Sequence, residues 1–374
     1  MKDCYRRTVA VHMVALGKAL KAAAVCGNRL RGSEAENMGV ASRMVALAER
    51  VAHSLMDENT VGVVLFGSLA RGRVDELSDL DLALVVEGGE PGLEEKLIGG
   101  VRVEVWRYDI KHFLHTFEDE KYRGRDDSWF LSSLWVGLMR EGVILEDPHG
   151  LLRKWRRQAL DWRWRKEEIL PLVRKAESCL RVAVGACSRE RFFEGIIALR
   201  DCCYNLANAQ IMIHNRIPSV RPKDIYRGVK QVGLKEFFDG IQGLEKLEKN
   251  RVERLLGELK RLLDDVWREP RGARTEYRNA VKSLARGELK VAVLNARYSA
   301  FFVGCRILQI EGEKTPVRLY DAETHLEMLD RLKGREGFIE VYRGLHGAEE
   351  LSSKRLRGFI RSAHRLLGSF PLNS

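Results

Sequence analysis

The sequence predicts an α+β protein, in which a small mixed-sheet domain is followed by one or more all-α helical bundles. Three observations predict this class. Short apolar runs with strand-like composition occupy segments 61–86 and 101–106. Long amphipathic helical patterns fill the chain beyond residue 150. Between these regions lies the turn-rich segment 142–150, which contains Pro148 and Gly150.

The 374 residues are enough for two or three domains with sizeable cores. We predict a first domain over 1–150, including N-terminal helices, a helical bundle over 151–268 and a further helical domain over 274–374. Residues 269–272 (EPRG) would link the last two. Apolar content of 45% and charged content of 31% are typical of a globular protein. Lys18 and Lys21 interrupt the apolar stretch that a signal peptide would need, so a cytoplasmic location is expected.

The expected elements of the first domain alternate between helix and strand. A helix over 1–35 is followed by a second helix, which should pack on the sheet through residues at helical spacing: Val40, Met44, Leu47, Ala48, Val51 and Leu55. A strand over 61–66, a tight turn, a second strand over 79–86, a loop and a short helix over 93–98 come next. The Gly99-Gly100 turn then leads into a strand over 101–106, and residues 110–145 look mostly helical.

Five helices are predicted in the bundle, over 151–163, 166–187, 190–214, 223–240 and 245–268. The region after it, 274–374, has the same helical character. Two helical segments in these regions end at Pro218 and Pro316, some 98 residues apart, which suggests a weak internal repeat.

Two acidic residues identify a candidate site. Side chains at i and i+2 of a strand share a face, so Asp79 and Asp81 should present two carboxylates side by side. Like charges this close need a compensating cation, and oxygen ligands favour Mg²⁺. The bend at Gly67 and Ser68 offers backbone N–H groups and a hydroxyl to a phosphate. The sequence therefore predicts a site for a metal-bound triphosphate.

These residues resemble the signature of the DNA polymerase β type nucleotidyltransferase superfamily: Gly67-Ser68, then Ala70-Arg71-Gly72, then Ser78-Asp79-Leu80-Asp81. The resemblance implies a third carboxylate on a neighbouring strand. Glu104 is the candidate, because the alternating valines around it would face a core and leave it on the other face. Asp79, Asp81 and Glu104 are thus the expected catalytic and metal-binding residues. Gly67, Ser68 and Arg71 are the expected nucleotide-binding residues, although Arg71 could instead pair with nearby acids.

The resemblance implies metal-dependent transfer of a nucleoside monophosphate from a triphosphate, with ATP favoured, to an acceptor hydroxyl. Two Mg²⁺ ions are expected, with Mn²⁺ as a substitute. The order of a sheet domain, an EDPHG turn and a helical bundle resembles kanamycin nucleotidyltransferase and its relatives. In those enzymes a Glu of the bundle acts as general base, for which Glu168 and Glu177 are the candidates here. Alternatives are an enzyme that adds nucleotides to RNA ends and an antitoxin-like or regulatory module with the same fold.

The charge distribution bears on the partner. Residues 59–149 contain 10 Lys and Arg against 18 Asp and Glu, whereas residues 150–374 contain 45 against 29. The basic helical part would attract a polyanion, or it would only balance its acidic neighbour. Small molecules, proteins and RNA stay open as acceptors, and so does a homodimer, but no membrane partner is expected. The seven cysteines show no zinc-ligand spacing, which favours reduced, buried thiols.

Overall fold

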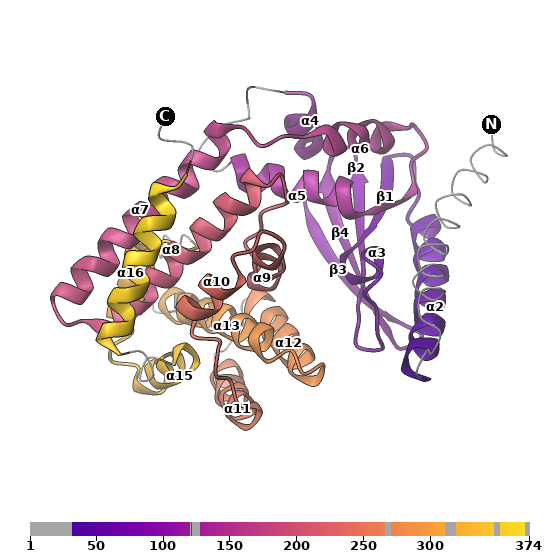
Figure 1. Ribbon diagram of the computed structural model, residues 1–374. Helices are drawn as coiled ribbons and strands as arrows, with labels where there is room; N and C mark the ends of the chain where they lie inside the picture. Colours follow the sequence, from indigo (N-terminus) through magenta and orange to yellow (C-terminus); the bar gives the residue numbers. More distant parts are fainter. Residues whose placement is uncertain are drawn as a thin grey trace. The chain divides into compact units, whose positions relative to one another are not determined.

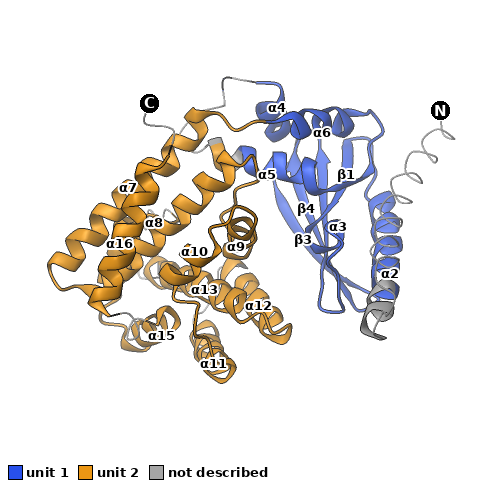
Figure 2. Cartoon of the chain, in the orientation of Figure 1, with its two compact units in different colours: residues 1–123, 131–162 blue, residues 124–130, 163–374 orange. Residues whose placement is uncertain are grey.

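The computed structural model describes residues 32–119, 121, 128–265, 271–310, 319–347 and 352–370. The chain divides into two compact units (Figure 2). Unit 1 comprises residues 1–123 and 131–162, and unit 2 comprises residues 124–130 and 163–374. A mixed sheet in unit 1 and helices throughout unit 2 confirm the α+β class. The domain boundaries at 150, 268 and 274 stay predictions, and unit 1 itself continues to Trp162.

Unit 1 is built on a five-stranded sheet with the order β3-β4-β2-β1-β5 (Figure 1). Its strands are β1 (Thr60–Phe66), β2 (Leu80–Val86), β3 (Gly92–Ile98), β4 (Val101–Asp109) and β5 (Val143–Glu146). β2 pairs parallel with β4, while the other three pairings are antiparallel. The strands expected over 61–66, 79–86 and 101–106 are confirmed as β1, β2 and β4, except that β2 begins at Leu80 and leaves Asp79 just before it.

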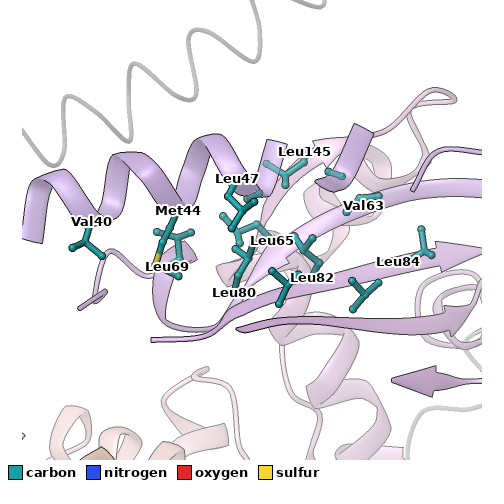
Figure 3. Close-up of a cluster of buried hydrophobic side chains, with 14 of the residues drawn as sticks. Val40, Met44, Leu47, Val63, Leu65, Leu69, Leu80, Leu82, Leu84 and Leu145 are labelled. Atoms are coloured by element: carbon teal, nitrogen blue, oxygen red, sulfur yellow. The ribbon is translucent and has the colours of Figure 1, made fainter. Parts of the chain in front are cut away.

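One face of the sheet is covered by α2 (Gly32–Ser54), as the apolar spacing from Val40 to Leu55 predicts. Val40, Met44 and Leu47 of α2 pack on alternate residues of the strands, among them Leu65 and Leu82 (Figure 3). Alternation in a strand sends the intervening side chains to the opposite face. Residues such as Asp81 and Val64 therefore point away from α2.

Short helices follow the strands: α3 (Gly67–Ala70) after β1, α4 (Lys111–Phe117) after β4, and then α5 (Ser128–Glu141) and α6 (Leu151–Asp161). A Cβ at Gly62 of β1 would lie 2.5 Å from a methyl carbon of Leu152, so α6 approaches this strand closely. The buried rings of Phe113, Trp135 and Trp155 pack together, with Phe113 4.7 Å from Trp135 and 5.3 Å from Trp155.

The short helix expected over 93–98 is wrong, because this segment is strand β3. Leu93 and Leu97 are four residues apart, which is typical of a helix, but β3 pairs antiparallel with β4. Gly99 and Gly100 have φ angles of 57° and 81°, as the two central residues of a tight hairpin require. The short strand β5 was also not predicted.

Unit 2 consists of helices in its described parts. They are α7 (Lys166–Ser188), α8 (Phe192–Ile213), α9 (Pro222–Gln231), α10 (Lys235–Gln242), α11 (Lys249–Asp265), α12 (Arg271–Ala285), α13 (Leu289–Ile310), α14 (Ala322–Arg331), α15 (Glu336–His346) and α16 (Ser353–Gly368). The helix expected over 223–240 is instead two helices, since Gly233 has a φ of 72° between them. Of the expected linker 269–272, residues 269–270 lie outside the described residues, whereas residues 271–272 are not a linker because they begin α12.

The ten helices described in unit 2 form two sets of five that follow the same plan. α8 and α13 each have 22 residues and start 97 positions apart, while α9 and α14 each have 10 residues. Both α10 and α15 end at a glycine with a positive φ, Gly243 and Gly347. The last helix of each set crosses to the other, since α11 packs on α12 and α13 and α16 packs on α7 and α8 (Figure 1). The suggested repeat is thus visible in the fold, and the two sets interlock.

Two buried arginines join the sets at equivalent positions of α8 and α13. Arg200 donates to the carbonyls of Ile241 and His346, and Arg297 donates to those of Leu345 and Gln242. Each guanidinium thus bonds the C-terminal ends of both α10 and α15, where backbone carbonyls lack helical partners. Burial lowers the pKa of both arginines, that of Arg297 to about 10, and Arg297 lowers the pKa of Arg200 further.

The interior of unit 2 also holds a long apolar helix. α13 is long and apolar enough to cross a membrane by length and composition, but 78% of that stretch is buried within the fold, as in the core helix of a bundle. Four of the five described cysteines are buried, at Cys179, Cys202, Cys203 and Cys305, which agrees with the expectation of buried thiols. Cys4 and Cys26 lie outside the described residues.

Candidate active site

The bend between β1 and α3 lies directly against one of the predicted acids. Gly67 has a φ of 76°, and a Cβ at this position would lie 1.8 Å from Oδ2 of Asp81. Only glycine leaves room for the carboxylate and adopts this backbone conformation without strain. Ser68 follows as the half-buried second residue of α3. The glycine of the expected bend therefore lies against Asp81, while the nucleotide-binding role of Gly67 and Ser68 stays a prediction.

Asp81 and Glu104 are direct partners in the parallel pairing of β2 and β4. Asp81 is half-buried and Glu104 is buried, with 7% of its surface exposed. Leu80 and Leu82 on one side, and Val103 and Val105 on the other, belong to the core cluster under α2. Alternation therefore places both carboxylates on the opposite face, on strands about 4.8 Å apart.

Asp79 lies just before β2, outside the strand itself. Leu80 is completely buried against the core, so Asp79 would share the face of Asp81 if the alternation of β2 continued one residue before the strand. A local hydrogen-bonded turn fixes the entry to this segment, since Oγ of buried Ser78 donates to Asp75 at 2.9 Å and accepts from its backbone N–H at 3.1 Å. Asp79 is half-buried.

One acid near this row was missed by sequence reasoning. Glu95 of β3 is the antiparallel partner of Glu104, so Glu95, Glu104 and Asp81 occupy adjacent positions on three neighbouring strands. Glu95 is exposed and also accepts a hydrogen bond from Arg102 at 3.3 Å. The signal that could have found it is the Gly99-Gly100 hairpin turn, which sets the register of β3 on β4.

Arg71 forms an ion pair with Glu141 of α5, with its Nη1 atom 3.3 Å from Oε2. Both side chains are partly exposed, at 28% and 36%. This ion pair corresponds to the alternative that Arg71 pairs with a nearby acid. A role in nucleotide binding stays a prediction, because a partly exposed guanidinium can exchange one anionic partner for another.

Comparison with protein families gives a match at this segment. Residues 49–133 match the model of a family described as nucleotidyltransferase domain. Unit 1 thus contains a nucleotidyltransferase domain. The match runs from the end of α2 through β1, α3, β2, β3 and β4 into α5, and so includes all the residues described above except Glu141.

The other comparisons find less similarity than the match to the family model. A comparison with curated proteins finds no match. Among solved structures, a nucleotidyltransferase-like protein from Exiguobacterium sibiricum 255-15 is 12% identical, over 78% of this chain and 88% of that chain, with a TM-score of 0.32.

The acids of the nucleotidyltransferase domain suit a hard cation by their chemistry, because carboxylate oxygens are the ligands that Mg²⁺ prefers. Asp81 and Glu104 come from registered strands and share a face, so both would help to hold a divalent ion. Within the part of the chain that the structure describes, no three His, Cys, Asp or Glu side chains gather as metal ligands. The carboxylates therefore suit a divalent cation by their chemistry. Their oxygen atoms do not converge as a set of three metal ligands in this structure.

The two candidate general bases lie in unit 2. Glu168 is completely buried in the first turn of α7, where its Oε2 atom accepts the backbone N–H of Arg165 at 2.9 Å. This helix cap accounts for a glutamate at that position. Glu177 is half-buried on the same helix and lines a groove between α7 and α16, beside His364.

Proposed function

We propose that the chain transfers a nucleoside monophosphate from a nucleoside triphosphate to an acceptor hydroxyl, in a metal-dependent reaction that releases pyrophosphate. The observation that supports this most is the packing of Asp81 against the Gly67 bend together with its pairing to Glu104. A scaffold that only needed stability would gain nothing from placing two like charges side by side. A metal-bound triphosphate gives that arrangement a purpose.

Asp79, Asp81 and Glu104 would hold the divalent cation, most suitably Mg²⁺ in two sites. When bound, the metal would supply positive charge to the triphosphate and would lower the pKa of a coordinated hydroxyl. Gly67 lets the backbone approach the phosphates, and the hydroxyl of Ser68 can donate to a phosphate oxygen. Arg71 would exchange Glu141 for a phosphate when the nucleotide binds.

The reaction itself is an in-line substitution at the α-phosphorus. The acceptor oxygen forms a new bond to phosphorus, the bond to the bridging oxygen of the β-phosphate breaks, and pyrophosphate leaves. The acceptor hydroxyl loses its proton to solvent water at the same time. Glu104 lies on the same face as Asp81 and would orient the acceptor for this step.

ATP is the favoured donor, and the acceptor could be a small molecule such as an aminoglycoside, a protein or an RNA end. The basic composition of residues 150–374 favours the RNA alternative. A regulatory or antitoxin-like module would not need the acids on a shared face, which disfavours a purely non-catalytic role.

The test is incubation of the chain with each of the four α-labelled nucleoside triphosphates and Mg²⁺, in the presence of tRNA, aminoglycosides or protein extract. We expect Asp79→Asn with Asp81→Asn to reduce label transfer at least about a thousandfold, because the triphosphate and its metal lose two ligands. The melting temperature without metal should stay nearly unchanged.

The matched control neutralises two exposed acids of the same unit, Glu76→Gln with Glu90→Gln. This control should transfer label like the unaltered chain. Undiminished transfer by the Asp79/Asp81 variant would overturn the proposal.

A further inference from the structure

The last helices of the two interlocked sets, α11 and α16, occupy equivalent places but carry different charges. Each contains five Lys or Arg residues. α11 also contains four acids, and three of them pair with basic residues one turn away: Lys249 with Glu253, Arg254 with Glu258, and Lys260 with Asp264. α16 contains no acid in its sequence. The charges of α11 are therefore largely neutralised, whereas α16, at the equivalent place in the other set, is strongly basic.

The basic residues of α16 form a regular row. Arg357, Arg361 and Arg365 recur every four residues, which spaces them about 6 Å apart along the helix, and all three are exposed. The apolar side of α16, with Leu356, Ile360, Ala363 and Leu367, is buried against unit 2. The row thus faces solvent as an array of positive charges on a rigid support.

A groove borders this row, between α16 and α7. Its volume is about 540 Å³, within the range of about 300–1,000 Å³ that is typical of small-ligand sites. Arg181 and His364 are exposed along it, Leu180 and Leu367 form its floor, and Val184 is 42% exposed beside them. α7 adds a second exposed cation, Arg174, two turns from Arg181. Half-buried Glu177 also lines the groove, but the cations of α7 and the α16 row outnumber it, so positive charge and apolar surface lie side by side.

We propose that this face of unit 2, the α7–α16 surface, binds single-stranded RNA. Regularly spaced arginines suit successive phosphates of one strand, and an apolar groove beside them suits an unpaired base. An acidic protein would match the charge but not the combination of a regular row with a base-sized groove. The proposal rests on the charge and shape of unit 2 alone and does not depend on nucleotidyl transfer.

The test measures binding of a fluorescent single-stranded RNA to the full chain by anisotropy at several salt concentrations, without nucleotide. The variant Arg357→Glu/Arg361→Glu/Arg365→Glu is compared with Lys249→Glu/Arg254→Glu/Arg261→Glu on α11, which changes net charge by the same amount. We expect the α16 variant to bind at least about tenfold more weakly and to show a smaller salt dependence, by about 0.7 in the logarithmic slope for each phosphate that no longer meets an arginine. The α11 variant should bind nearly as well as the unaltered chain.

Glutamine versions of both variants remove the charges without reversing them, and circular dichroism confirms that each variant is folded. Arg181→Gln, across the groove on α7, should also weaken binding. Equal losses in the α11 and α16 variants would overturn the proposal, since they would show attraction by net charge only. Tighter binding of single-stranded DNA, or of polyglutamate of equal charge, would overturn the assignment to RNA.

Discussion

Both units bring like charges together, but in different surroundings. In unit 1, Asp81 and Glu104 are paired on neighbouring strands beside the bend at Gly67, with Asp79 just before them. In unit 2, Arg200 and Arg297 are buried and bond the C-terminal carbonyls of α10 and α15. A helix C-terminus carries about half a negative charge, so the two helix ends offset about one of the two positive charges.

This difference separates a structural role from a functional one. The arginines satisfy carbonyls that would otherwise be buried without partners, and they do so symmetrically across the two sets of helices. The acids lie at a glycine bend of the segment that matches a nucleotidyltransferase domain, on the sheet face opposite α2. Changes to the acids should therefore alter activity, and changes to the arginines should alter stability.

The largest effect is expected where the bend of unit 1 contacts Asp81. Gly67→Ala places a Cβ within 1.8 Å of the carboxylate oxygen, so Asp81 must move and activity should fall at least about a hundredfold. Gly88→Ala is the matched control, because Gly88 has a φ of 77° and open space around its Cα. It shares the backbone strain without the clash. Equal activity loss in both variants, measured as label transfer, would show that strain alone matters.

Substitution of the buried arginines of unit 2 should lower stability, whereas substitution at the Gly67 bend should lower activity. Arg200→Met or Arg297→Met leaves two helix-end carbonyls without their donor, and we expect the free energy of unfolding to fall by about 3–5 kcal/mol. Denaturant unfolding measures this loss. Arg254→Met on α11, at a side chain 70% exposed, should change stability by less than about 0.5 kcal/mol. A single buried variant as stable as this control would contradict the structural role.

The arginines also make stability depend on pH through His346. Burial, together with Arg297, Arg200 and His325, holds the pKa of His346 well below its ordinary value of 6.5. Arg200 donates to Nδ1 of this ring at 2.9 Å, so the neutral ring accepts there. Below pH 6.5 the imidazole of His346 is protonated in the unfolded chain but stays neutral in the folded chain. The stability that depends on the neutral His346 ring is therefore present above pH 6.5 and is lost as the pH falls.

Unfolding measured between pH 7.5 and 5 should show a loss approaching about 1.4 kcal/mol per pH unit from this group. His346→Asn, which keeps an acceptor for Arg200, should remove that part of the slope. An unchanged slope in the variant would assign the pH dependence to other groups.

The smallest effect is expected at Arg71, which has a structural ion pair with Glu141 and a proposed role in binding the triphosphate. A partly exposed ion pair contributes little, so Arg71→Ala and Glu141→Gln should each change stability by less than about 1 kcal/mol. If Arg71 binds the triphosphate, its loss alone should raise the KM for the nucleotide about tenfold. Similar kinetics in both variants would leave Arg71 with its ion pair only.

Sequence reasoning located the parts of unit 1 that depend on local pattern. The apolar spacing of α2, the strands around Gly67 and the alternation at Glu104 follow from residues close together in the chain. β3 was mistaken for a helix because most of its residues are exposed and carry no strand-like alternation. The pairing of β3 with β4 depends on the Gly99-Gly100 turn. This turn is a stronger indication of a hairpin than the four-residue spacing of Leu93 and Leu97 is of a helix.

The arrangement of unit 2 could be predicted only in part. Two proline-terminated helices about 98 residues apart suggested a repeat, and α8 and α13 show it in their equal lengths. The exchange of α11 and α16 between the two sets leaves no local trace, because an amphipathic helix packs equally well on either set. The hydrogen bonds from Arg200 and Arg297 to the ends of α10 and α15 join the two sets, and the sequence alone does not predict them.

We propose that Asp79, Asp81 and Glu104 hold a metal-bound triphosphate at the bend of Gly67 and Ser68. The most direct measurement is a crystal structure of the chain with a non-hydrolysable triphosphate and Mn²⁺, with anomalous scattering used to locate the metal. We expect an anomalous peak within bonding distance of Asp81 and Glu104, and phosphate density beside Ser68. A triphosphate and metal bound away from these acids would contradict the claim.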